Sequence, residues 1–147
     1  MEQLVKVLSV VYCVALLCGQ LCDEDRTEKS RDRLHVSVLR EQILRFDSSA
    51  TTPRHCVAIG SSYGGWVDPA PDVIDALDDS NVVLAMSKCS KPSHSEIFHW
   101  VKRVSIRRSR ATVVASYDDG MGTEYEYELR RKGGHWIVKS VDELRVE

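Results

Sequence analysis

The last third of the chain alternates apolar and polar residues, and this alternation constrains the fold more than any other feature. It runs through residues 111–117, 123–130 and 135–146, with turn-forming residues between the segments. In the middle segment, one set of alternate positions holds Thr123, Tyr125, Tyr127 and Leu129, and the other holds Glu124, Glu126, Glu128 and Arg130. A period of two is typical of strands with one buried face, so the sequence predicts a C-terminal β-meander.

Gly133 and Gly134 indicate how the last two strands pair. Glycine readily adopts the positive φ angles that a two-residue hairpin loop requires, so Lys132 is expected to pair with His135. Counting outward, the predicted pairs are Arg131 with Trp136, Leu129 with Val138, Glu128 with Lys139 and Tyr125 with Asp142. A slip of one residue would turn the apolar face to solvent, so the pattern and the turn agree on this register.

The N-terminus has the pattern of a secretory signal. Lys6 precedes an apolar run from Val7 to Cys18, and an acidic stretch begins at Asp23. We therefore predict a signal peptide over residues 1–22, a flexible lead-in over 23–33 and a single domain over 34–147. The run is shorter than the roughly 20 residues that span a bilayer, so only the signal segment is expected to meet a membrane. The predicted location is secreted or periplasmic. A lipid anchor on Cys18 or Cys22 is less favoured, because leucine rather than a small residue precedes each cysteine.

Export changes the interpretation of the five cysteines. Cys13 and Cys18 would leave with the signal peptide, and Cys22 would remain near the new terminus. Cys56 and Cys89 are then the expected disulfide, because disulfides persist in oxidising compartments. Closing a loop of this size would stabilise the fold by about 3 to 4 kcal/mol in the chain-entropy model. The alternative is two free buried thiols.

The segments before the meander predict two helices and short strands. Val36, Leu39, Ile43 and Phe46 have helical spacing, which predicts an amphipathic helix from Asp32 to Phe46. A strand is expected at Cys56–Ile59 and another at Val82–Met86. Between them, Asp68 is a candidate cap for a short helix through Val73 and Leu77, with Pro69 or Pro71 in its first turn. These elements form one α+β domain.

The order of these elements carries a resemblance to a known fold. An amphipathic helix, the strand Cys-Val-Ala-Ile, Asp-Pro with a short helix, and long antiparallel strands ending in Gly-Gly-His-Trp-Ile-Val follow one another from residue 34 to residue 146. This looks like the nuclear transport factor 2-like fold, which SnoaL-like proteins, ketosteroid isomerases and exported bacterial proteins share. The resemblance implies a curved, mostly antiparallel, cone-like sheet covered by the helices. Catalytic members carry an Asp or His base and a Tyr donor inside the cone, and no such set maps onto this chain.

Several side chains are candidates for a binding site. Tyr117, Tyr125 and Tyr127 either line a cavity inside the cone or, as we favour, pack as core with their hydroxyls at its rim. Asp142 is placed opposite Tyr125 by the predicted register and is either a pocket carboxylate or a solvated strand end. Trp66, in a glycine-flanked loop, either covers a pocket or lies over the sheet edge.

Cofactor and metal sites are not predicted. The spacing of Cys89, His94 and His99 is wider than that of structural zinc sites, and the disulfide uses the same cysteine. Nucleic-acid binding is not predicted either, because the short cluster Arg107, Arg108 and Arg110 is interpreted as protection of an edge strand against aggregation.

The resulting hypothesis is an exported, non-enzymatic domain that binds a small apolar ligand or a protein partner through its cone and its Trp66 loop. The first alternative is a small-molecule enzyme of the isomerase, dehydratase or hydrolase type. The second is an inhibitor or immunity-type protein that acts through its exposed sheet. A homodimer formed through the sheet is compatible with each of these functions.

Overall fold

The computed structural model describes residues 27–45, 54–61, 64–77, 83–90, 95–118 and 122–146. The chain divides into two compact units, Met1–Arg31 and Asp32–Glu147. Of the first unit, residues 27–31 are described and are helical. The predicted signal peptide lies outside the described residues, as do Phe46 and His94.

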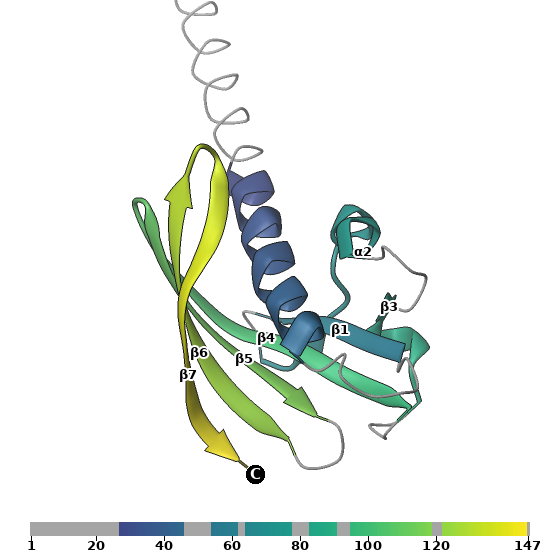
Figure 1. Cartoon of the computed structure of the whole chain (residues 1–147). Coiled ribbons are helices and arrows are strands. Elements are labelled where there is room, and N and C mark those ends of the chain that lie inside the picture. The colour runs from purple at the N-terminus through teal and green to yellow at the C-terminus, as the bar shows by residue number, and fades with distance from the viewer. Residues whose placement is uncertain are drawn as a thin grey trace, which may run out of the picture. The chain divides into compact units, whose positions relative to one another are not determined.

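The second unit contains a seven-stranded sheet (Figure 1). Its strands are β1 (Arg54–Gly60), β2 (Trp66–Val67), β3 (Val83–Ala85), β4 (Glu96–Arg107), β5 (Arg110–Asp118), β6 (Thr123–Lys132) and β7 (His135–Val146). They are ordered β2-β1-β4-β5-β6-β7, and β3 pairs with β1. β1 is parallel to β3 and β4, and the other pairings of the described strands are antiparallel. The predicted α+β class and C-terminal meander are therefore confirmed, with a sheet that does not close.

A long helix packs against one face of this sheet and begins earlier than predicted. Helical structure covers residues 27–45, so it already includes positions before Asp32. Its buried residues are Leu34, His35, Val38, Leu39 and Gln42. Val36 and Ile43, which the sequence placed on the buried stripe, are only half-buried. The buried face is thus rotated from the predicted one and includes two polar side chains.

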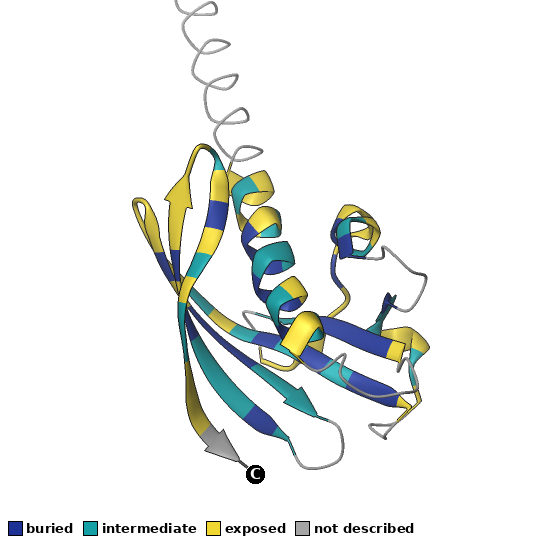
Figure 2. Ribbon diagram, viewed as in Figure 1, coloured by how far each residue is buried: buried dark blue, intermediate teal, exposed yellow. Residues whose placement is uncertain are grey.

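The main core lies between the sheet and the two helices, the second of which is α2 (Pro71–Leu77). Buried positions follow the sheet-facing side of the long helix and the strands below it (Figure 2). Tyr127 is fully buried here, together with Leu34, Leu39 and Val113. These side chains form part of the packed core beneath the long helix.

The short helix α2 is confirmed, but its predicted cap is wrong. Pro71 is the first residue of the helix, a position where the missing amide proton removes no hydrogen bond. The carboxylate of Asp68 instead accepts hydrogen bonds from the backbone N–H of Ser87 at 3.0 Å and from its hydroxyl at 2.5 Å. Asp68 therefore ties the segment after β2 to the 3-10 helix η1 (Met86–Lys88).

The predicted register of the β6–β7 hairpin is correct near its turn. Lys132 pairs with His135, Arg131 with Trp136 and Leu129 with Val138. Both turn glycines have positive φ angles, 57° at Gly133 and 82° at Gly134, as the two-residue loop requires. The turn chemistry therefore set this part of the pairing.

Beyond Val138 the predicted register is wrong, because Lys139 is the extra residue of a β-bulge. Glu128 pairs with Ser140 instead of Lys139. One inserted residue displaces all later pairs, so Glu143 lies opposite Tyr125, and Asp142 lies opposite Glu126. Asp142 is thereby removed from the tyrosine face to which the sequence assigned it.

Candidate ligand pocket

A second, smaller core lies on the sheet face that points away from the helices. Cys56 and Ala58 are buried on this face of β1, and Met86 of η1 packs against them. Phe98 and Trp100, on alternate positions of β4, complete the cluster. Cys56 pairs with Phe98 and Ala58 with Trp100 across the parallel strands β1 and β4. This face of the sheet is therefore apolar at one end.

A disulfide joins this cluster to the segment after η1. Cys56 and Cys89 are bonded, with their Cα atoms 6.3 Å apart, within the range usual for disulfides. The predicted pairing is thus present, and it holds the end of η1 against β1. No helix in the described part of the chain is long and apolar enough to cross a membrane.

Polar contacts fix the same segment at two further points. One is the pair of hydrogen bonds from Ser87 to Asp68. The other is the carboxylate of Glu96, which accepts a hydrogen bond from the backbone N–H of Ser90 at 3.1 Å and forms an ion pair with Arg54 at 2.6 Å. Residues 86–90 are therefore held as a wall beside the sheet.

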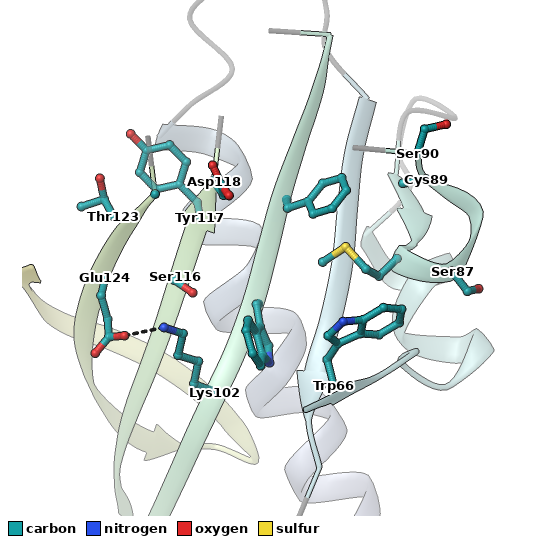
Figure 3. A pocket seen from close by; sticks show the side chains of 14 residues that line it. Trp66, Ser87, Cys89, Ser90, Lys102, Ser116, Tyr117, Asp118, Thr123 and Glu124 are labelled. Carbon is teal, nitrogen blue, oxygen red and sulfur yellow. Dashed lines mark hydrogen bonds and ion pairs between the residues drawn. The ribbon is translucent and has the colours of Figure 1, made fainter. Parts of the chain in front are cut away.

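This wall and the sheet enclose a pocket of about 450 Å³ (Figure 3). Its apolar lining comes from β2, the wall and β4: Trp66, Met86, Cys89, Phe98 and Trp100. Its remaining lining is mainly polar and comes from the wall and from β4, β5, β6 and the residue before β6: Ser87, Ser90, Lys102, Ser116, Tyr117, Asp118, Gly122, Thr123 and Glu124. In the close view, Trp66 and the polar end formed by Lys102 and Glu124 lie on opposite sides of the pocket. The pocket is therefore amphipathic.

Lys102 follows Phe98 and Trp100 on the pocket-facing side of β4, and it is also the position at which β4 carries a bulge. The pairing with β5 shifts between Val101 and Arg103, which makes Lys102 the extra residue. Its ammonium lies 2.6 Å from a carboxylate oxygen of Glu124 and 5.4 Å from the centre of the Trp100 ring. The backbone of β1 approaches this bulge so closely that a Cβ at Gly60 would collide with the Lys102 carbonyl oxygen. Only glycine fits at that position.

Only some of the binding residues that the sequence predicted line the pocket. Trp66 and Tyr117 line the pocket, and the side chain of Trp66 is 45% exposed. Tyr125 and Tyr127 do not line it. They extend the aromatic row from Tyr117 along the helix-facing side, with ring centres 6.1 and 6.5 Å apart. Asp142 is exposed on β7, outside the pocket.

Tyr127 is part of a polar group inside the main core. Its hydroxyl and both polar atoms of the Gln42 side chain are buried without a hydrogen-bond partner. Burial raises the pKa of Tyr127 well above its ordinary value. The Tyr127 phenol therefore stays protonated in the core.

Tyr125 is half-buried beside Tyr127. Burial also raises the pKa of Tyr125, and the neighbouring Tyr117 and Glu143 add to the increase. This phenol is held in its protonated form as well. Both tyrosines therefore contribute uncharged aromatic surface to the region beneath the long helix.

Sequence reasoning missed most of the pocket residues, although one signal was present. The start of β4 reads Ile-Phe-His-Trp-Val, which is apolar or aromatic at every position. Such a run indicates a strand covered on both faces. The structure agrees: His99 and Val101 face the main core, and Phe98 and Trp100 face the pocket.

Comparison with known proteins adds no further assignment. No protein-family model, curated protein or solved structure matched this chain.

Proposed function

We propose that this protein binds a small, largely apolar molecule in the pocket beside the Cys56–Cys89 disulfide. The observation that carries this proposal is the pocket's lining, two tryptophans and a phenylalanine beside a partly buried ion pair. Small-molecule sites typically have volumes of 300–1,000 Å³, and they combine apolar walls with a few polar groups that orient the ligand. The volume of about 450 Å³ lies within this range.

The two ends of the pocket suggest different roles in binding. Trp66, Phe98 and Trp100 offer aromatic surface to the body of the ligand. Lys102, Ser116 and Glu124 offer hydrogen-bond donors and acceptors to a single polar group. A molecule with an aromatic or alicyclic body and one hydroxyl, carbonyl or amine fits this division.

Binding is favoured over catalysis by the chemistry of the described lining. It includes no histidine, and its one cysteine is held in the disulfide. Lys102, the cation in the lining, is engaged with Glu124 and stacked over Trp100. The isomerase-like alternative places its base and its tyrosine inside the cone, where Tyr127 is buried in the main core. The resemblance to the nuclear transport factor 2-like fold remains a prediction, and our candidate site does not depend on it.

We also propose that the protein works outside the cytoplasm, secreted or in the periplasm. The supporting features are the signal-like segment from Lys6 to Cys18 and the disulfide. Disulfides are rare in reducing compartments, and both features are compatible with export.

A neutral fluorescent probe, N-phenyl-1-naphthylamine, tests the pocket directly. Two of the three tryptophans of the chain line the pocket, so bound probe should quench tryptophan emission while its own emission rises. We expect Trp66→Ala to weaken binding about tenfold, because it removes one aromatic wall. Ser116→Phe, which would place a ring inside the pocket, should abolish binding.

Ile137→Ala is the matched control for these variants. Ile137 is 41% exposed, close to the 45% of Trp66, and lies outside the pocket on β7. Its substitution should leave probe affinity unchanged. If the wild type does not bind the probe, or if Ser116→Phe binds it as tightly as the wild type, the pocket is not a ligand site. If Trp66→Ala leaves binding intact, Trp66 and its exposed neighbour Val67 are better explained as a protein contact.

A further inference from the structure

A second hollow lies on the sheet near the β4–β5 turn, and its lining is basic. Its volume is about 780 Å³. Four cations line it, together with one carboxylate: Arg107, Arg110, Arg130, Lys139 and Glu128. The side chains of Ser105 and Thr112 add two hydroxyl groups. All five charged residues are exposed, and none of them lines the ligand pocket. The hollow is a separate site.

The strand register brings three of these cations into one row. Arg107 of β4 pairs with Arg110 of β5, and Arg110 pairs with Arg130 of β6. Directly opposed residues share a sheet face, and neighbouring strands are about 4.8 Å apart, so the row spans roughly 10 Å. Lys139 of β7, the extra residue of the bulge, lines the same hollow. Residues distant in sequence thus form one compact cationic group.

Like charges opposite one another destabilise a sheet, so this row calls for an explanation. In the described structure, no ion pair is formed by Arg107, Arg110, Arg130 or Lys139. Edge protection, the interpretation drawn from the sequence, does not account for Arg110 and Arg130. β5 and β6 have a strand on each side, so neither is an edge.

We propose that this hollow binds a small polyanion, a molecule carrying two or three phosphate or sulfate groups. Arginine suits this role, because its planar guanidinium donates paired hydrogen bonds to such oxygens. The two hydroxyl groups can donate to the same anion. A multivalent anion would also relieve the repulsion within the row.

The charges around the hollow restrict the size of the ligand. The outer face of β6 carries Glu124 and Glu126 beyond Glu128, and Asp142 of β7 lies opposite Glu126. A nucleic-acid strand or a flat anionic membrane that contacted the arginines along the sheet would also meet this acidic row. A compact anion about 10 Å across avoids it. The patch therefore fits a small molecule better than a polymer or a bilayer.

Inorganic triphosphate is the simplest probe, measured by isothermal titration calorimetry at constant ionic strength. We expect wild-type protein to bind triphosphate more tightly than pyrophosphate, and pyrophosphate more tightly than monophosphate. Arg110→Gln and Arg130→Gln should each weaken triphosphate binding about tenfold, the usual effect of losing one charge-assisted hydrogen bond. Arg103→Gln is the matched control, because Arg103 is an exposed arginine of β4 outside the hollow.

Glu128→Gln should increase the affinity for triphosphate, and a misfolded variant would not show such an increase. Removing the one carboxylate of the hollow should tighten triphosphate binding several-fold. The proposal is overturned if Glu128→Gln weakens binding or if Arg103→Gln costs as much as Arg110→Gln. It is also overturned if monophosphate binds as tightly as triphosphate.

Two further ligands separate the small-molecule proposal from its macromolecular alternatives. They are a single-stranded oligonucleotide of about ten nucleotides and vesicles containing an anionic phospholipid. Weaker binding of both than of triphosphate supports the proposal. If either binds with an arginine-dependent affinity that triphosphate lacks, the row is a macromolecular contact and the proposal is wrong. The neutral naphthylamine probe reports on the other pocket, so the two proposals can fail separately.

Discussion

His55 and His99 form a buried pair in the core, on the adjacent strands β1 and β4. The Nδ1 atom of His55 lies 2.9 Å from the Nε2 atom of His99, and the ring centres are 5.1 Å apart. Both side chains are almost completely buried. Burial, and to a smaller extent the neighbouring His55, lower the pKa of His99 from 6.5 to about 3. His99 is therefore neutral in the folded protein at neutral pH.

This lowered pKa predicts how stability depends on pH. In the unfolded chain His99 binds a proton below pH about 6.5, whereas in the folded protein it stays neutral down to about 3. The stabilising effect is thus complete above pH 6.5 and is lost as the pH falls toward 3. The free energy of unfolding should decrease by on the order of 1 kcal/mol per pH unit within this window. His99→Phe should flatten this slope, measured by urea unfolding at pH 7, 6, 5 and 4.

His135→Gln is the control for this experiment. His135 is exposed at the β6–β7 turn, so its substitution should leave the slope unchanged. The carboxylates of the protein contribute equally to every variant, so the comparison isolates the histidine. An unchanged slope in His99→Phe would contradict the prediction.

Individual side chains show where the sequence was informative and where it was not. The Cys56–Cys89 bond was predictable, because the export expected from the sequence would leave few cysteines to pair. The burial of Gln42 and His99 was not, because polar residues are normally assigned to the surface. The ligand pocket combines residues from β2, η1, β4, β5 and β6, and alternation along one strand cannot show which strands become neighbours.

At the level of elements, the bulge in β7 is the clearest departure from the predicted pairing. Regular alternation cannot place both Val138 and Val141 on the core face, because they are three residues apart. Both nevertheless pack against the main core, and Lys139 is the extra residue between them. The spacing of the two valines in Val-Lys-Ser-Val was therefore a signal for the bulge. Counting pairs outward from the turn did not use this signal.

Two single-residue deletions test this explanation. Deleting Lys139 should leave a regular ladder from the turn to Tyr125, with Leu129 still opposite Val138 and Glu128 opposite Ser140. The free energy of unfolding should change by less than about 1 kcal/mol, because no core residue moves. Deleting Ile137 should instead turn Val138 outward and bring Lys139 opposite Leu129. We expect a loss of about 3 kcal/mol or more, because a charge enters the core.

The readout for the two deletions is the midpoint of urea unfolding, compared at constant pH. Equal losses in both variants would mean that the length of β7, rather than its register, determines stability. A larger loss on deleting Lys139 would contradict the assignment of the bulge. Loss of triphosphate binding without loss of stability in this variant is expected, since Lys139 also lines the basic hollow.

At the scale of the whole molecule, one face of the sheet packs the main core and the other face forms the ligand pocket. The helix-facing side of the sheet holds the main core, and its other side holds the apolar cluster that forms one end of the ligand pocket. The basic hollow lies toward the β4–β5 turn, and the ligand pocket lies toward the opposite ends of β5 and β6. The overall α+β class followed from periodicity. The pocket on the second face of the sheet could not be predicted from periodicity, because the pattern of a half-buried strand assigns that face to solvent.

The last prediction concerns where the exported chain starts and whether the chain folds from that residue. If residues 1–22 are a signal peptide, sequencing of the exported product should start between Gln20 and Asp25. An intact Met1 on a cytosolic product would contradict export. The main core begins at Leu34, so a chain that starts at Asp23 should unfold cooperatively and bind the naphthylamine probe.

A chain that starts at Glu41 is the control for this truncation. It lacks Leu34, Val38 and Leu39, which are completely buried against the sheet. Losing three such side chains removes roughly 2 kcal/mol each, which approaches the whole stability of a domain of this size. Circular dichroism should show no cooperative unfolding for this chain. If it folds as well as the chain from Asp23, the long helix is dispensable and the core lies within the sheet and α2 alone.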